Sequence, residues 1–244
     1  MRILVVNVNT TEQVSEQIGA TARAVAAPGT EIVPLTPRFG ADSVEGNLES
    51  YLAAVGVLDA VTRYDGPYDA VVQAGFGEHG IEGLRELGSV PAVDITEAAA
   101  MLACLVGRSY SVVTTLDRTV PLIEDRLRLT GVLGRCASVR ASGLPVLELE
   151  ADPDRAVRAI VAEAEAAVRH DRAEVIVLGC GGMGGLDDAV RDAVGVPVVD
   201  GITAAVKLAE SLVALGLGTS KIRTYATPRP KRISGWPLAR EADE

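Results

Sequence analysis

Aromatic residues and histidine are scarce in this chain. Its 244 residues include one Trp, five Tyr, two Phe and two His, whereas 48% of the sequence is hydrophobic. The core must therefore consist mainly of Ala, Val and Leu, and a chain of this length buries a substantial core. Together with 25 glycines, this composition favours an α/β fold in which helices and strands approach closely.

Cysteine and basic charge are also limited. Three cysteines without short spacing do not match a disulfide framework or a zinc site. Lys and Arg number 23 against 33 Asp and Glu, for a net charge of −10. A nucleic-acid-binding protein needs a basic surface patch, so this charge balance disfavours that class of function. No apolar run reaches the roughly 18 residues of a membrane span, and the opening MRILVV is typical of a strand rather than a signal peptide. We therefore expect a cytoplasmic protein whose partner is a small-molecule substrate, with no nucleic acid and no membrane.

Short apolar strands alternate with helical segments along the chain. The clearest predicted helix is Asp152–Arg169, and Thr10 with Gln13 matches a helix-capping box. Strand–helix alternation at this spacing predicts parallel sheets built from right-handed crossover units. The predicted strands are Arg2–Val6, Glu31–Leu35, Ala70–Ala74, Ala92–Val93, Ser111–Val113, Ala137–Val139, Val175–Leu178 and Val198–Val199.

The sequence also repeats itself. GLRELGSVPAVDITEAA, which starts at residue 83, aligns without a gap on AVRDAVGVPVVDGITAA, which starts at residue 189. The repeat places Asp94 on Asp200, each beside a helix start, and we interpret both as helix caps. Just upstream, DAVVQAGFG aligns with EVIVLGCGG after a shift of one residue, which pairs Gly75 with Cys180. Because ligands bind beyond the carboxyl ends of parallel strands, we expect these two positions on opposite sides of one ligand.

The repeat predicts two pseudo-symmetric α/β domains, each a mainly parallel four-stranded sheet flanked by helices, with the active site in the cleft between them. Domain 1 comprises residues 1–96 and 206–226, and domain 2 comprises residues 97–205. Residues 227–244 are rich in proline and charge, and we expect a flexible C-terminal tail. The tail carries Trp236, which is suited to docking on a neighbouring subunit.

Cys180 lies in VLGCGGMGG, between a predicted strand end and the amides that open the next segment. Such a position is expected to lower the pKa of a thiol, which suits it to acid/base or nucleophilic chemistry. We interpret Cys104 and Cys136 as core residues. GFGEHG and GCGGMG both match the dinucleotide-binding pattern G-x-G-x-x-G, but the first strand–helix turn, NVNTT, lacks it. These glycines instead favour close approach of backbone N–H groups to an anionic oxygen.

A likeness to a known family is carried by the segments NVNTT, SVVTTLDRTVPLIEDRL, RCASVRASGLPVLELE, VLGCGGM and PVVDGITAAVKLAE. Together they resemble the hydantoin/allantoin racemase branch of the aspartate/glutamate racemase superfamily, up to about Leu217. The resemblance implies a homo-oligomeric isomerase that uses no cofactor and no metal. It also implies two cysteines, one per domain, on opposite faces of an acidic C–H carbon, because one face loses a proton and the other receives one.

By this resemblance Cys180 matches the second cysteine, whereas Gly75 stands at the place of the first. Glu78 and His79 replace the acidic residue and proline that follow it in relatives, so the candidate catalytic residues are Cys180, His79 and Glu78. Amides and hydroxyls around them are expected to bind the substrate and stabilise an enolate oxygen. These candidate substrate-binding residues are Asn7, Asn9, Thr10, Gly75, Phe76, Gly77, Thr114, Thr115, Gly181 and Gly182.

The glycine at position 75 leaves three functions open. His79 or Glu78 could supply the second base of a racemase or epimerase that acts on a small ureide or amino-acid derivative. A single thiol at Cys180 could serve a decarboxylase or isomerase that protonates one face, as in the related arylmalonate decarboxylase. A third alternative is a relative that binds a small molecule without turnover.

Overall fold

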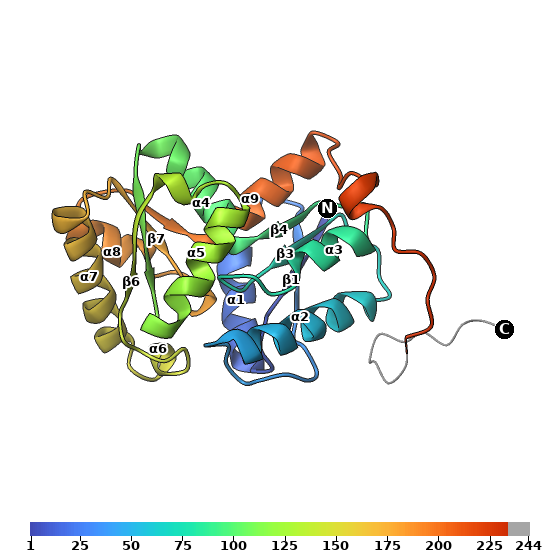
Figure 1. Ribbon diagram of the computed structural model, residues 1–244, viewed down its shortest axis with the longest axis horizontal. Coiled ribbons are helices and arrows are strands. Elements are labelled where there is room, and N and C mark those ends of the chain that lie inside the picture. Colours follow the sequence, from blue (N-terminus) through green and yellow to red (C-terminus); the bar gives the residue numbers. More distant parts are fainter. Residues whose placement is uncertain (234–244) are drawn as a thin grey trace.

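Two parallel four-stranded sheets lie side by side along the long axis of the molecule (Figure 1). The structure is a computed structural model and describes residues 1–233. The first sheet has the order β2-β1-β3-β4 and contains β1 (Arg2–Val6), β2 (Glu31–Leu35), β3 (Ala70–Gln73) and β4 (Ala92–Asp94). The second has the order β6-β5-β7-β8 and contains β5 (Tyr110–Thr114), β6 (Cys136–Ala141), β7 (Val175–Leu178) and β8 (Val198–Asp200). The predicted fold class of two parallel α/β sheets is confirmed, and each predicted strand overlaps one of these.

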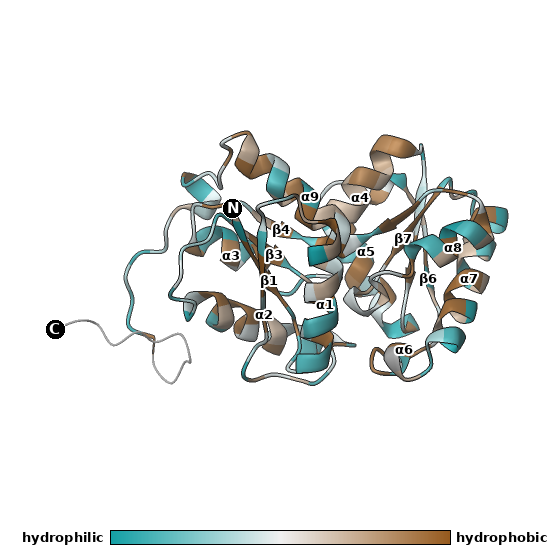
Figure 2. Ribbon diagram, turned by 180° about the vertical axis from the view of Figure 1, so that it is seen from behind, coloured by the Kyte–Doolittle hydropathy of each residue, from teal (hydrophilic) through white to brown (hydrophobic). Residues whose placement is uncertain are grey.

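Helices cover both faces of each sheet. In the described residues they are α1 (Glu12–Val25), α2 (Asn47–Thr62), α3 (Ile81–Leu87), α4 (Ile95–Val106), α5 (Val120–Leu129), α6 (Glu148–Ala151), α7 (Pro153–His170), α8 (Asp187–Val194) and α9 (Gly201–Ala214). The outer faces of the sheets pack on α2 and α3 in the first half and on α7 and α8 in the second. In Figure 2 strands such as β1 and β7 are brown, whereas α7 alternates between brown and teal, as expected for a helix with one buried face.

The inner faces of both sheets share one apolar core. It contains Val5 and Val72 from the first sheet and Val112 and Val177 from the second, together with residues of α1, α4, α5 and α9. Two of these helices are exchanged: α4 follows β4 but packs on β5 and β7, whereas α9 follows β8 but packs on β3, β4 and α1. The predicted domain limits at residues 96 and 206 fall inside these exchanged helices.

Two of the predicted helix caps are confirmed and one is wrong. The side chain of Asp94 accepts the N–H of Glu97 at 2.8 Å, and that of Asp200 accepts the N–H of Thr203 at 2.7 Å. The predicted capping box at Thr10 does not form, because the Thr10 hydroxyl donates to the carbonyl of Ala41 at 3.2 Å and α1 begins two residues later.

After α9 the chain returns to the first sheet. The Thr219 hydroxyl donates to the Val90 carbonyl at 2.8 Å, and the Tyr225 hydroxyl donates to the Glu82 carboxylate at 2.5 Å. Residues 227–233 form neither helix nor strand. The prediction for the remainder of the tail, including Trp236, lies outside the described residues. None of the helices described here has the length and apolar character needed to cross a membrane.

Candidate active site

Gly75 and Cys180 follow equivalent strand ends. The N–H of Ala74 donates to the last carbonyl of β1 at 2.8 Å, and the N–H of Gly179 donates to the carbonyl of Val113 in β5, also at 2.8 Å. Ala74 and Gly179 therefore occupy the same place in their sheets, and the next residue is Gly75 in one half and Cys180 in the other. The strand register agrees with the pairing predicted from the sequence repeat.

A cavity of about 50 Å³ lies between the two halves, at the carboxyl ends of the strands. A volume of this size holds only a few water molecules. A ligand the size of a small ring therefore requires the surrounding loops to move apart. The cavity is lined by Asn7, Val8, Asn9, Val14, Ile18, Val44, Ala74, Gly75, Phe76, His79, Thr114, Thr115, Thr119, Val146, Gly179, Cys180, Gly181 and Gly182.

Ten of the thirteen candidate residues from the sequence are among the residues that line this cavity. The other three point elsewhere: Thr10 binds the loop at Ala41, the N–H of Gly77 donates to the Thr96 hydroxyl at 2.8 Å, and the Glu78 carboxylate pairs with Arg126. The lining residues that the sequence did not indicate are mostly small or apolar and carry no chemical signature. They are Val8, Val14, Ile18, Val44, Ala74, Thr119, Val146 and Gly179.

The loop after β1 is held in shape by its own asparagines. The Asn7 Oδ1 atom accepts the N–H groups of Val8 at 2.7 Å and Asn9 at 3.2 Å. The Asn7 Nδ2 atom donates to the Asn9 side chain at 2.8 Å and to the Ser15 hydroxyl at 3.0 Å. These bonds fix the loop that carries Val8, which lines the cavity.

Cys180 carries a neutral thiol. It is partly accessible at the wall of the cavity and precedes a short 3₁₀ turn, Gly181–Met183. Burial raises the pKa of Cys180 to about 11 and outweighs the backbone N–H groups of Gly182 and Met183, which lower it. The carboxylate of Glu45 raises it further. The predicted lowering of this thiol pKa is therefore wrong, because desolvation by the cavity walls exceeds the effect of the nearby amides.

The space beside Gly75 is already filled. A Cβ atom built on Gly75 would lie 2.4 Å from the Val8 Cγ1 atom and 2.6 Å from the His79 Cδ2 atom. A side chain at this position therefore requires Val8 or His79 to move. The two strand ends therefore differ. Cys180 places a thiol at one of them, whereas Gly75 has no side chain and Val8 and His79 fill the space beside it.

Gly75→Ala is expected to destabilise the protein by about 1–3 kcal/mol, because the added methyl group overpacks this contact. Thermal unfolding followed by circular dichroism would show a lower Tm. Gly134→Ala is the matched control, since no heavy atom lies within 4 Å of a Cβ built there. Equal Tm values for the two variants would contradict the close packing around Gly75.

His79 is buried and anchored by its neighbours. The Ser50 hydroxyl lies 3.0 Å from the His79 Nδ1 atom and donates to the Glu78 carbonyl at 2.6 Å. Burial lowers the pKa of His79 to about 4, although the carbonyl of Phe76 opposes this shift. The imidazole is therefore neutral near neutral pH and is held in one orientation.

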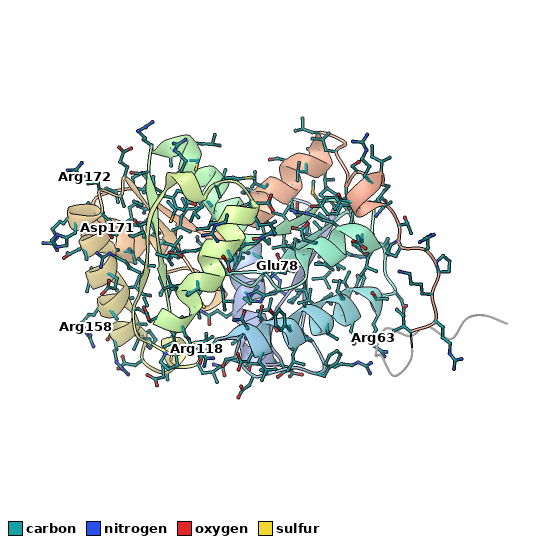
Figure 3. All side chains as sticks on the ribbon, viewed as in Figure 1. Arg63, Glu78, Arg118, Arg158, Asp171 and Arg172 are labelled. Carbon is teal, nitrogen blue, oxygen red and sulfur yellow. The ribbon has the colours of Figure 1, made fainter. Side chains whose placement is uncertain are left out.

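Glu78 lies at the boundary between the two halves, beside α5 (Figure 3). Its Oε2 atom is 2.9 Å from the Arg126 Nη1 atom, and its Oε1 atom accepts the N–H of Gly80 at 3.1 Å. The side chain is 43% exposed. Burial raises the pKa of Glu78, and the charge of Arg126 opposes that rise.

A hydrogen bond joins the two halves beside the cavity. The Glu45 Oε1 atom accepts the N–H of Val146 at 3.0 Å. Glu45 belongs to the loop between β2 and α2, and Val146 belongs to the loop between β6 and α6. Val44 and Val146 both line the cavity, so this bond holds two of its walls together.

Comparison with known proteins places these features in a family. Residues 3–209 match the family model described as Asp/Glu/Hydantoin racemase. The chain belongs to this family. It is 41% identical to the hydantoin racemase of Rhizobium meliloti over 236 residues, which cover 96% of this chain and 98% of the relative.

Two solved structures of allantoin racemases are also similar to this racemase. That of Pseudomonas fluorescens is 71% identical, with a TM-score of 0.95, and covers 96% of this chain and 100% of its own. That of Klebsiella pneumoniae is 45% identical, with a TM-score of 0.93, and covers 96% of each chain. The protein is therefore an isomerase of the racemase type, and the cavity between its halves is the candidate active site.

Proposed function

We propose that this racemase inverts the acidic C–H centre of a small cyclic ureide such as allantoin or a 5-substituted hydantoin, without a cofactor. The observation that carries the proposal is the cavity itself, which receives Cys180 from one half and the Gly75–Gly80 loop from the other. Both segments leave equivalent strand ends, so a planar carbon between them has one segment on each face. The relatives named above, a hydantoin racemase and two allantoin racemases, support the substrate class.

Inversion needs two groups that exchange protons on opposite faces. Cys180 is the group on one face. Because its pKa is raised to about 11, the thiol holds its proton near neutral pH and acts as the donor when the opposite group is the base. In the reverse direction the thiolate accepts the proton and the opposite group returns one.

We propose Glu78 as the group on the other face, with His79 as the alternative. Burial raises the pKa of Glu78, which makes its carboxylate a stronger base than an ordinary glutamate. The pKa of His79 is lowered to about 4 and its ring is anchored by Ser50, so it is a weak base. Glu78 pairs with Arg126 outside the cavity lining, and it reaches the substrate by rotation of its partly exposed side chain.

The developing enolate oxygen needs donors that are in place before the reaction. The N–H groups of Gly181 and Gly182 and the hydroxyl groups of Thr114 and Thr115 belong to residues that line the cavity. All four come from the half that also carries Cys180. We propose that the Gly181 and Gly182 N–H groups and the Thr115 hydroxyl bind the carbonyl next to the reacting carbon, whereas the Thr114 hydroxyl donates to the Gly179 carbonyl at 3.1 Å and supports the segment that carries Cys180. Asn7 and Asn9 contact the substrate from the other half.

The function is tested by incubating single enantiomers of allantoin and of a 5-substituted hydantoin with the protein in D₂O. We expect loss of circular dichroism together with deuterium uptake at the stereocentre in the proton NMR spectrum. Deuterium uptake with retained configuration would instead indicate one active face and favour a single-thiol reaction, which carbon dioxide release from a malonate-type acid would establish. Absence of any exchange would contradict the proposed substrate class.

A further inference from the structure

One helix of each half, α1 or α5, contacts the loop that follows the equivalent strand end of the other half. In the first half, α1 packs against the 3₁₀ turn that follows Cys180, where the Ile18 Cδ1 atom lies 3.7 Å from a Cβ built on Gly181. In the second half, α5 packs towards the loop that follows Gly75, and its Arg126 side chain contacts Glu78. The arrangement is the same on both sides of the cleft, but the contacts differ in chemistry.

Ile18 and Arg126 hold equivalent places. Both helices follow an inner strand of their sheet, and in each the seventh and eighth residues are buried, Ile18 and Gly19 in α1 and Arg126 and Leu127 in α5. An apolar side chain therefore supports the loop that carries the thiol, whereas a guanidinium supports the loop that lacks one. The charged contact is confined to the side of the cleft where a second acid/base group has to be supplied.

Arg126 is fully buried and is surrounded by acidic groups. Its Nη1 atom lies 2.9 Å from Glu78 and 2.8 Å from Glu82, and its Nη2 atom lies 2.5 Å from Asp94 and 3.2 Å from Glu97. A buried guanidinium needs a carboxylate partner, and the fully buried Asp94 already provides one. The contact with the partly exposed Glu78 is therefore additional to what burial of Arg126 requires.

We propose that Arg126 is a positioning residue for racemisation, which holds Glu78 as a carboxylate in the loop that borders the cavity between turnovers. This inference rests on the proposed role of Glu78 as the second acid/base group. Arg126 does not line the cavity, so its side chain acts only through the carboxylates that it contacts, including Glu78. The same side chain binds Asp94, the cap of α4, and thereby ties the loop to the helix that joins the two halves.

The charges around Glu78 fix the expected direction of the pH effect. Arg126 and the N–H of Gly80 favour its charged form, whereas burial and the carboxylates of Glu82 and Asp94 disfavour it. Arg126 is the cation in this set, so its removal leaves Glu78 among like charges and raises the pKa of Glu78. As the pH falls, the Glu78 carboxylate is therefore protonated at a higher pH in the variant than in the parent protein.

The test compares the pH dependence of kcat/KM for Arg126→Gln, Arg126→Lys and the parent protein, with allantoin as the probe. For Arg126→Gln we expect the acidic limb to move up by about one to three pH units, the usual effect of an opposite charge at this distance. Arg126→Lys keeps the charge but loses the forked contacts, so its acidic limb should stay near that of the parent while kcat falls. An unchanged acidic limb in folded Arg126→Gln, or an unchanged kcat in Arg126→Lys, would overturn the proposal.

Arg140→Gln is the matched control. Arg140 pairs with Glu163 and Asp171, and Asp171 lies at the far end of the second half from Glu78 (Figure 3). This variant also breaks an ion-pair cluster, but its pH profile should match the parent. If Arg126→Gln does not fold, as judged by circular dichroism, Arg126→Lys decides the question through kcat.

Failure of this inference is distinguishable from failure of the proposed function. If Glu78→Gln remains fully active, then the role of Glu78 is wrong and Arg126 has nothing to position. If Glu78→Gln is inactive but both Arg126 variants behave like the parent, then Glu78 keeps its role and only the role of Arg126 is wrong.

Discussion

Cys180→Ser is expected to lower kcat for stereoinversion by a factor of about 10²–10⁴, the usual contribution of a positioned acid/base group. A serine hydroxyl is a much weaker acid than a thiol, so it neither donates nor accepts the proton on that face at a useful rate. The loss should be equal for both enantiomers, because each passes through the same two groups. Circular dichroism of allantoin, started from each enantiomer in turn, measures both rates.

The substitution is nearly isosteric, so the fold should be retained and the Tm should change little. Cys104→Ser provides the control, since Cys104 lies on α4 and packs against the central core rather than the cavity. Unchanged turnover in Cys180→Ser would remove the thiol from the mechanism, and the proposal for the Gly181–Gly182 donors would fail with it.

Glu78→Gln is the second substitution with a large expected effect. Glutamine keeps the shape of the side chain but accepts no proton, so we expect inversion to fall by about 10²–10⁴-fold. His79→Asn should have a much smaller effect on kcat, because burial already keeps the pKa of His79 near 4. Rates for both enantiomers, measured across the acidic range, also report the raised pKa of Glu78 as a loss of activity when the carboxylate is protonated.

Glu78→Gln and His79→Asn together decide which of the two side chains is the second acid/base group. Full activity in Glu78→Gln together with inactivity in His79→Asn would assign the second group to the imidazole. Glu86→Gln, on the neighbouring helix α3, is a control for loss of one acidic charge, and it should leave turnover unchanged. If both loop variants were active, a one-sided reaction at Cys180 would be the remaining explanation.

The architecture could be predicted because its signals are local. Most strands are short apolar runs, and the repeat places Asp94 on Asp200 as helix caps, both of which form. The pairing of Gly75 with Cys180 also follows from the repeat and agrees with the strand register. These features depend on neighbours in the sequence or on the internal alignment, and a single sequence contains both.

The electrostatics of the site could not be predicted in the same way. Arg126 lies in EDRLRL, which is typical of a solvent-facing helix, and its burial depends on carboxylates from the loop before α3, from α3 and from the start of α4. The raised pKa of Cys180 comes from its burial, and the apolar residues packed around it, such as Leu149 and Ile160, come from segments distant in the sequence. Desolvation is a property of the assembled cavity, so reasoning from the amides beside the thiol gave the wrong sign.

Because α4 and α9 are exchanged, neither half of the sequence contains all the helices that cover its own sheet. Residues 1–94 alone would leave the inner face of the first sheet without α9, and the second sheet likewise depends on α4. We infer that neither repeat is a self-sufficient folding unit and that the chain unfolds as one cooperative block. The two faces of the cleft are therefore joined by helices that each half receives from the other.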